Sequence, residues 1–295
     1  MISYPLLTTQ QSTVVCQLQQ YTLIEIKGED AEKYLQGQLT CDVTKLEIGQ
    51  TTLTAHCDPK GKTVSLFRLI RTEAQCFYVL IKKSLLPTAL DLLKKYAVFS
   101  KVTFTELNWQ IIGLAGETTC KAFSDINAQI RIDIQTQQPR TLLIHPTSLD
   151  ITPNMPYQIW DLLDIQDGMP LLSAQTQGEF IPQALNVQSI EQGISFQKGC
   201  YIGQEIVARA KYRGANKRAM FTLVGNSIET PEIGSEVEMQ LENNWRKTGI
   251  VLSAVNIEGV LWLQVVLNNQ LEENTQFRLA EDIPLNLYPL PYELV

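Results

Sequence analysis

The spacing of hydrophobic residues predicts alternating strands and helices in the first third of the chain. Residues 21–27 are rich in β-branched side chains, which is typical of a strand. Apolar residues then recur at helical spacing over 31–39, and Asp30 is placed to cap that helix. A helix is also expected after Ser84, and further strands are expected at 51–57, 62–71, 75–81, 101–107 and 110–114. This order is that of an α+β unit with an antiparallel sheet.

A tight turn separates the second and third of these strands. Asp58, Pro59 and Gly61 occupy its first, second and fourth positions, where a type I turn prefers these residues. The neighbouring Lys60 and Lys62 allow a second interpretation, in which the loop presents cations to a bound anion. Both interpretations stay open from the sequence.

Later segments repeat the α+β pattern less clearly and then change character. We interpret residues 109–184 as a second unit, with a helix from Met155 to Ile165 and strands at 130–134 and 141–144. After Arg218, Gly, Asn, Pro and acidic residues separate short apolar runs at 219–224, 236–241, 247–255, 260–267 and 275–279. Short strands at regular spacing, without a helical period, predict a compact β-barrel or sandwich.

Length and composition are those of a multidomain globular protein. The chain has 295 residues, which exceeds one ordinary core, so two or three domains are expected. Hydrophobic residues make up 44% and charged residues 19%, and no run approaches the roughly 18 apolar residues of a membrane span. The first residues lack a basic leader with an apolar core, so we expect a cytoplasmic protein without a membrane partner.

The cysteines and histidines argue against two kinds of site. The six cysteines are widely scattered without a C-x-x-C pair, and the chain has only two histidines. We therefore expect no metal site and no disulfide framework, but reduced thiols in a reducing compartment. The acidic pI of about 5.0 also argues against broad, nonspecific binding of nucleic acid.

One octapeptide, Lys-Gly-Cys-Tyr-Ile-Gly-Gln-Glu at 198–205, combines a thiol, two glycines and mixed charge. Gly199 and Gly203 can adopt positive φ angles and admit a ligand to the backbone, and Lys198 is placed to favour the thiolate of Cys200. This pattern predicts a reactive or ligand-contacting thiol. The alternative is a cysteine that packs as a small apolar residue in a glycine-rich bend.

The octapeptide opens a locally basic segment. Residues 198–218 contain a single acid, Glu205, and have a net charge of +5 in a chain whose total is −7; the basic residues are Lys198, Arg209, Lys211, Arg213, Lys217 and Arg218. An anionic partner fits this segment, whether a carboxylate-bearing small molecule, a phosphate or RNA, and a solvated charged surface is the alternative. The segment also lies at a predicted domain junction, where ligand sites are common.

The same region carries a family resemblance. Residues 193–218 closely resemble the signature of the YgfZ family of folate-binding, tRNA-modifying proteins. The resemblance extends over essentially the whole chain, through segments 32–38, 55–62, 94–102, 180–183 and 244–249.

The resemblance implies a fold like that of the glycine-cleavage T-protein, arranged around a central hole. Two ferredoxin-like units would form a folate-binding body, one over residues 1–110 and one over 111–216, with an approximate boundary across which they can interleave. A C-terminal β-barrel would follow over 217–295. The family also implies binding of tetrahydrofolate in the hole and support of tRNA methylthiolation and of iron–sulfur enzymes, with a link to the control of replication initiation.

The resemblance also suggests folate-binding residues. Of two aromatic positions associated with folate, Trp160 is kept, while Tyr21 replaces the common tryptophan and offers less stacking area. Without the resemblance, Trp160 would be interpreted as a core residue of an amphipathic helix. We expect the anionic glutamate tail to meet cations, and the pterin edge to meet the side-chain amides of Gln183 and Asn186. The candidate cations are Lys198, Arg209, Lys217 and Arg218.

The candidate catalytic residues differ from those of the T-protein. The segment 57–62 stands where T-proteins carry the aspartate that is central to aminomethyl transfer, so that activity is not expected. Cys200 is then the candidate reactive thiol, as a nucleophile, a redox group or a transient ligand of an iron–sulfur centre. Three hypotheses follow: a folate-dependent accessory protein for iron–sulfur tRNA-modifying enzymes, a one-carbon transferase, or a noncatalytic protein that contacts tRNA directly.

Overall fold

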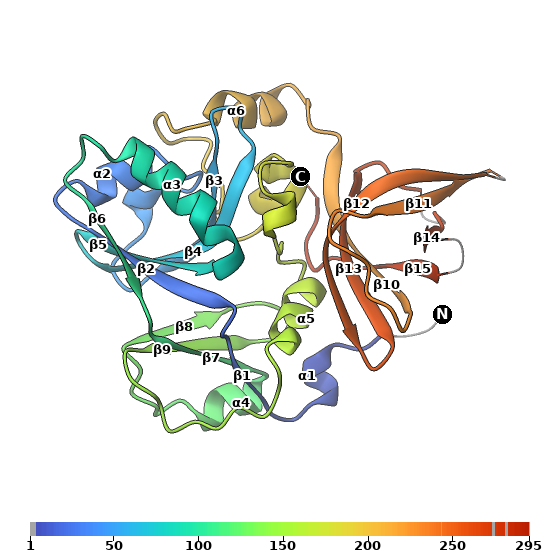
Figure 1. Cartoon of the computed structure of the whole chain (residues 1–295), viewed down its shortest axis with the longest axis horizontal. Coiled ribbons are helices and arrows are strands. Elements are labelled where there is room, and N and C mark those ends of the chain that lie inside the picture. The colour runs from blue at the N-terminus through green and yellow to red at the C-terminus, as the bar shows by residue number, and fades with distance from the viewer. Residues whose placement is uncertain (1–3, 243, 273–274, 281–282, 295) are drawn as a thin grey trace.

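A computed structural model describes residues 4–242, 244–272, 275–280 and 283–294. It has two antiparallel sheets and a closed six-stranded barrel (Figure 1). The predicted α+β architecture with a C-terminal barrel is thereby confirmed. Within the described ranges, no helix is both long enough and apolar enough to cross a membrane.

The first sheet has five strands in the order β3-β4-β5-β2-β6. Helix α2 follows β2 and helix α3 follows β5, and both helices cover one face of the sheet (Figure 1). The elements are β2 (Tyr21–Lys27), α2 (Ala31–Gln36), η1 (Val43–Lys45), β3 (Thr51–Cys57), β4 (Thr63–Glu73), β5 (Cys76–Lys82), η2 (Lys83–Leu85), α3 (Leu86–Tyr96) and β6 (Thr103–Leu107).

Two helix starts differ from the sequence prediction. Asp30 stands before α2, but its carboxylate accepts a hydrogen bond from the backbone N–H of Lys101 at 2.8 Å and does not cap the helix. The helix also ends at Gln36 because Leu39 pairs with His56 in an isolated bridge beside the sheet. Ser84 lies inside a 3₁₀ turn, and α3 begins two residues later without a side-chain cap.

The second sheet has four strands in the order β1-β7-β9-β8. Its elements are α1 (Leu7–Gln10), β1 (Val14–Gln17), β7 (Gln110–Ala115), α4 (Glu117–Ala122), β8 (Ile130–Ile134), β9 (Arg140–His145) and α5 (Gln158–Gln166). Strand β1 pairs with β7 although the whole first sheet separates them in the chain. Residues 14–17 therefore belong to the second sheet, although they precede the first sheet in the chain.

The junction between the sheets and the barrel contains short helices: η3 (Ala174–Thr176), η4 (Pro182–Leu185), η5 (Val187–Ser189) and α6 (Gln204–Tyr212). Asn186 joins this segment to the barrel, since its side chain exchanges hydrogen bonds of 2.7 and 3.1 Å with the backbone of Met220. Gln264 makes a second link from inside the barrel wall, donating to the carbonyl of Met169 at 2.7 Å and accepting from the N–H of Leu171 at 2.9 Å.

The barrel closes through the strand order β10-β13-β12-β11-β14-β15. Its strands are β10 (Arg218–Asn226), β11 (Glu236–Leu241), β12 (Asn244–Ile257), β13 (Val260–Asn268), β14 (Phe277–Leu279) and β15 (Ile283–Tyr288). The short strand β15 was not predicted from the sequence. It completes the closure, since it pairs with both β10 and β14.

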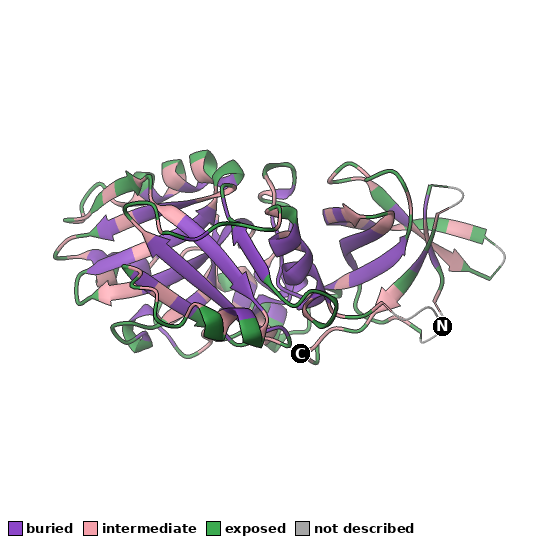
Figure 2. Cartoon of the chain, turned by 90° about the horizontal axis from the view of Figure 1, so that it is seen from below, coloured by how far each residue is buried: buried purple, intermediate pink, exposed green. Residues whose placement is uncertain are grey.

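Buried residues continue from the sheets into the barrel (Figure 2). One apolar cluster contains Leu23 of the first sheet, Ile111 of the second, Trp160 of α5 and Trp262 of the barrel. Helix α5 lies between the second sheet and the barrel (Figure 1), which explains why almost all of its side chains are buried. Polar groups on this helix therefore face protein or a cavity.

Candidate functional site: a cavity between the two sheets

A cavity lies where the two sheets meet α5 and the segment that follows it. The space open to the centre of a water-sized sphere is about 70 Å³, and all atom-free space in and in front of the cavity, solvent included, is about 650 Å³. Leucines from both sheets and Phe67 form much of its wall, together with the segment 169–172. The polar side chains that reach it are Tyr21, Arg68, Lys82, Arg140 and Asp164. Apolar walls with a few converging polar groups are typical of a site for a small organic ligand.

Trp160 and Tyr21 both line this cavity although they come from different elements. The indole of Trp160 is buried, and the guanidinium of Arg140 lies over it with Cζ 4.9 Å from the ring centroid. Gly113 of β7 lies directly behind the indole, since a Cβ on Gly113 would come within 2.5 Å of two ring atoms. The absence of a side chain at Gly113 thus leaves the space that the ring occupies.

Tyr21 starts β2, and its half-buried ring lies 5.9 Å from the Nζ atom of Lys82. Lys82 also forms an ion pair of 3.0 Å with Asp161 of α5. Burial, followed by the charges of Asp164 and Asp161, raises the pKa of the Tyr21 phenol well above its usual value. Tyr21 therefore stays a neutral aromatic surface at physiological pH.

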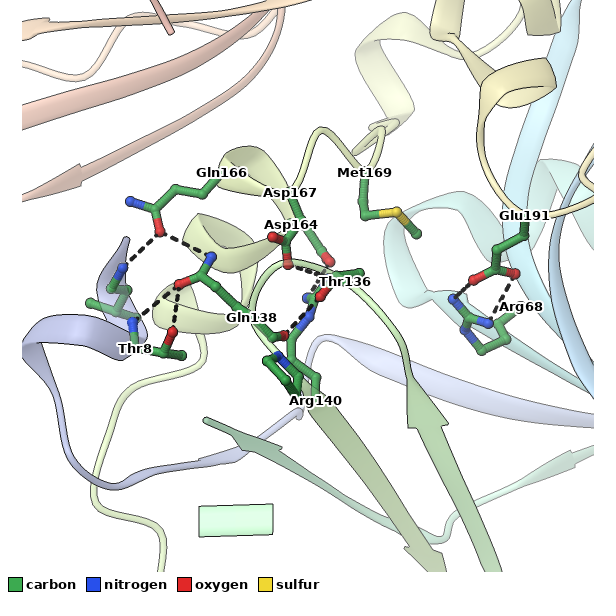
Figure 3. A network of polar contacts seen from close by, with 12 residues as sticks. Thr8, Arg68, Thr136, Gln138, Arg140, Asp164, Gln166, Asp167, Met169 and Glu191 are labelled. Atoms are coloured by element: carbon green, nitrogen blue, oxygen red, sulfur yellow. Dashed lines mark hydrogen bonds and ion pairs between the residues drawn. The ribbon is translucent and has the colours of Figure 1, made fainter. Parts of the chain in front are cut away.

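A buried charge cluster lies beside Trp160 and is drawn in Figure 3. The Arg140 side chain is fully buried and lies 2.5 Å from a carboxylate oxygen of Asp164 and 3.3 Å from one of Asp167. Burial alone would lower the pKa of Arg140, but Asp164 and Asp167 raise it overall. Burial raises the pKa of Asp167 despite the opposing charge of Arg140. One guanidinium thus lies between two carboxylates, and of these three groups Arg140 and Asp164 line the cavity.

Two glutamines connect this cluster to the N-terminal segment (Figure 3). Gln138 donates to the side chain of Gln166 at 3.2 Å, and its own oxygen accepts from the backbone N–H of Thr8 at 3.1 Å. The oxygen of Gln166 also accepts from the N–H of Leu7 at 3.0 Å. These hydrogen bonds hold the segment before β1 against Gln138 and Gln166.

Four polar residues of the cavity were not predicted from the sequence: Arg68, Lys82, Arg140 and Asp164. A signal existed in α5, where Asp161, Asp164 and Asp167 recur every three residues on a largely apolar helix beside Trp160. Such a row of acids on a buried helix requires cationic partners. The partners themselves lie on β5 and β9, so only the fold identifies them.

The octapeptide at 198–205 is anchored to the segment that follows α2, outside the cavity wall. Lys198 is buried, and its amine donates to the carbonyls of Leu39 at 2.8 Å and Cys41 at 2.7 Å. Burial lowers the pKa of Lys198 to about 8, although the charges of Cys41 and Asp42 oppose the shift. The structure thus gives this lysine an anchoring role, which differs from the expected contact with an anionic tail.

Cys200 lies in this anchored loop, and its side chain is exposed to solvent. Beneath it, the N–H of Ile202 donates to the carbonyl of Gly37 at 3.1 Å, and Gly203 packs on the hairpin turn that begins at Asp58. The other cysteines are buried, apart from the half-buried Cys120. In the part of the chain that the structure describes, no group of His, Cys, Asp and Glu side chains is arranged to hold a metal ion.

The backbone amides of the hairpin turn bind a carboxylate of the turn itself. The carboxylate of Asp58 accepts hydrogen bonds from the N–H groups of Lys60 at 2.9 Å and Lys62 at 2.8 Å. The amine of Lys62 donates to the carbonyl of Glu179. These contacts support the structural interpretation of the turn over an anion-binding loop.

Replacement of Gly203 by Ala is expected to lower the free energy of unfolding by about 1–3 kcal/mol. The residue has a φ of +83°, and an added Cβ would meet the Asp58 carbonyl oxygen at 2.7 Å and the Gly61 Cα at 2.9 Å. Denaturant unfolding measures the loss, and a thiol reagent reports whether the buried Cys57 beneath the loop becomes accessible. Gly199→Ala is the matched control, because its Cβ would meet nothing within 4 Å. Equal stability of the two variants would contradict the anchoring described above.

The remaining predicted residues lie away from the cavity wall. Gln183 and Asn186 are buried in the junction, where Gln183 donates to the carbonyl of Val207 at 2.6 Å and Asn186 binds the backbone of β10. Arg209, Lys217 and Arg218 are exposed on and after α6, and Arg209 pairs with Glu205 at 2.7 Å. The structure therefore separates an exposed basic surface from the aromatic cavity.

Comparison with known proteins places this arrangement in a class. Aminomethyltransferase T of the glycine cleavage system from Bartonella henselae superposes with a TM-score of 0.65 over 95% of this chain and 86% of its own, at 13% identity. The model of the GCVT N-terminal domain matches residues 5–140, and that of the YgfZ β-barrel domain matches residues 216–282. The fold is therefore that of the T-protein class, with a YgfZ-type barrel.

Sequence relatives define the family more closely. The tRNA-modifying protein YgfZ of Photorhabdus laumondii is 39% identical over 99% of this chain and 96% of its own, and that of Enterobacter sp. is 40% identical over 98% and 96%. An uncharacterized protein of Haemophilus influenzae is 57% identical over 94% of this chain and 97% of its own. The chain belongs to the YgfZ family, as its signature indicated.

Proposed function

We propose that the chain binds a reduced folate, tetrahydrofolate or a derivative, in the cavity between the sheets. The observation that carries this proposal is the convergence of Tyr21 and Trp160 on one cavity that also holds charged groups. The pterin and aminobenzoyl rings need flat apolar walls, and aromatic side chains provide them. The Asp164 carboxylate at the wall can accept hydrogen bonds from the amino groups of a pterin.

We further propose that folate binding serves tRNA modification. The names of the relatives support a role in tRNA modification, and we infer that methylthiolation by iron–sulfur enzymes is the step that is supported. Cys200 fits such a role because it is an exposed thiol on a loop held by buried contacts. An exposed, rigidly presented thiol can contact a partner protein or its cluster.

A host strain that lacks its own YgfZ protein provides the test. The wild-type chain is expected to restore methylthiolated nucleosides in tRNA, measured by mass spectrometry of digested tRNA. Cys200→Ala is expected to fail at equal protein level. Cys120→Ala is the matched control, since Cys120 is a half-buried thiol far from the octapeptide in sequence. Full restoration by Cys200→Ala would remove the thiol from the mechanism.

Direct contact with tRNA is a second candidate, favoured by the exposed basic residues on and after α6. A gel shift with a steep salt dependence is expected, and it should be lost when Arg209, Lys211 and Arg213 are neutralised together. Absence of any shift at low salt would exclude this contact. Aminomethyl transfer is less well supported, because Asp58 uses its carboxylate to hold the hairpin turn.

A further inference from the structure

Arg68 and Glu191 form an ion pair (Figure 3), and of the two only Arg68 lines the cavity. Arg68 belongs to β4 and is only 7% exposed, yet it lines the cavity. Its two terminal nitrogens donate to the two carboxylate oxygens of Glu191, at 2.8 and 3.2 Å. This two-pronged geometry is the one in which a guanidinium binds any carboxylate most strongly.

Glu191 is held in this place at a conformational cost. It is a non-glycine residue with a φ of 50°, in the left-handed region that side chains avoid. One of its oxygens also accepts from the N–H of Leu53 at 2.6 Å. Burial would raise the pKa of Glu191, but Arg68 and these hydrogen bonds hold it below its usual value. The carboxylate is therefore present as an anion.

The pair also separates the cavity from two neighbouring hollows. Arg68 lines the cavity, whereas Glu191 lines both hollows. Met169 lines the cavity and the smaller hollow, and its side chain lies between the Arg140 cluster and the ion pair (Figure 3). The larger hollow contains Lys45 and Arg131, together with three acids besides Glu191: Asp42, Glu47 and Asp133.

We propose that Arg68 is the anchor for the anionic tail of the folate, and that Glu191 occupies this anchor until the ligand displaces it. The proposal rests on the proposed function, because it assigns the ligand's carboxylate. The side chain of Glu191 presents the same chemical group as the glutamate tail, so one carboxylate can replace the other without leaving Arg68 unpaired in a buried place. The Glu191 side chain is 30% exposed and can turn toward the solvent of the hollows.

Arg68 also sets the direction in which the glutamate tail of the folate leaves the cavity. A tail bound at Arg68 points toward the larger hollow, where acids outnumber the cations. Lys45 already pairs with Asp42 at 3.9 Å and Arg131 with Asp133 at 3.5 Å. The cavity would then distinguish folates from tail-less pterins through Arg68. Additional γ-linked glutamates find no unpaired cation among the described residues of this hollow, so the triglutamate is expected to bind about as tightly as the monoglutamate.

The test compares ligands with and without a tail on matched variants. Titration calorimetry uses 5-formyltetrahydrofolate, its γ-linked triglutamate and the tail-less 6-methyltetrahydropterin. Glu191→Gln removes the competing charge and is expected to tighten both folates, on the order of tenfold for a coupling of this kind. It should leave 6-methyltetrahydropterin unchanged.

Arg68→Gln is expected to weaken both folates toward the affinity of the pterin, and the double variant should behave like Arg68→Gln alone. Thermal unfolding confirms that each variant is folded, and Glu191→Gln decides the matter even if Arg68→Gln does not fold. Equal or weaker folate binding by folded Glu191→Gln would overturn the inference while leaving folate binding intact. Absence of binding of any folate to the folded wild-type chain would instead overturn the proposed function.

Discussion

Replacement of Arg140 by Met is expected to lower the free energy of unfolding by about 3–5 kcal/mol at neutral pH. The guanidinium is fully buried and is the ion-pair partner of both Asp164 and Asp167. Its removal leaves two carboxylates near each other in a place where charge is poorly solvated. Denaturant unfolding at fixed pH measures the loss.

The pH dependence of this loss follows from the sign of the carboxylate shift. The pKa of Asp167 is already raised in the folded wild-type chain, and removal of Arg140 takes away the charge that opposes the rise. A raised aspartate pKa penalises the fold above that pKa, and the penalty is relieved as the pH falls through it toward the unfolded value. The difference between wild type and Arg140→Met should therefore shrink between neutral and acidic pH.

Two further variants separate this effect from simple loss of packing. Asp164→Asn and Asp167→Asn in the Arg140→Met background remove the buried charges, and they are expected to recover part of the stability at neutral pH. Lys121→Ala breaks an exposed ion pair with Glu117 and should cause no measurable change. A pH-independent loss in Arg140→Met would contradict the charge argument.

Replacement of Gly113 by Ala is expected to weaken binding of 5-formyltetrahydrofolate by at least about tenfold, because a displacement of an ångström costs a preorganised site this much or more. The added methyl would lie 2.5 Å from two atoms of the Trp160 ring and 3.1 Å from Leu18, so the indole must shift from its place in the cavity wall. Overpacking of this kind also costs about 1–3 kcal/mol of stability. Titration calorimetry and denaturant unfolding measure the two effects.

Gly37→Ala is the matched control for this prediction. Its Cβ would meet its nearest neighbour at 3.5 Å, which is ordinary contact. Affinity and stability should stay close to wild type. Combining Gly113→Ala with Trp160→Phe gives the smaller ring the room that it needs, so stability is expected to recover. Unchanged affinity in Gly113→Ala would show that the position of Trp160 does not determine binding.

Local sequence signals predicted much of the fold. The Asp-Pro-Lys-Gly turn fixed the hairpin of β3 and β4, because its side chains and glycine stabilise that turn without distant partners. Pairing of β1 with β7 could not be predicted in this way, since it depends on contacts between segments about 100 residues apart. The short strand β15 is likewise defined by its neighbours in the barrel.

In the candidate site, too, contacts between distant segments could not be predicted from the sequence. Trp160 and Tyr21 were singled out through the family resemblance, and both line the cavity. The basic segment drew attention to Lys198, but a count of charges does not show that backbone carbonyls already satisfy that amine. No local sequence pattern indicated a role for Arg140. Its partners lie 24 and 27 positions further along the chain, and only the fold brings them close.

The most direct test of the central claim is a crystal structure of the chain with 5-formyltetrahydrofolate. We expect density for the pterin in the cavity, against Trp160 and Tyr21, with the tail directed to Arg68. A folate bound at the Cys200 loop or on the basic surface of α6, with an empty cavity, would contradict the account.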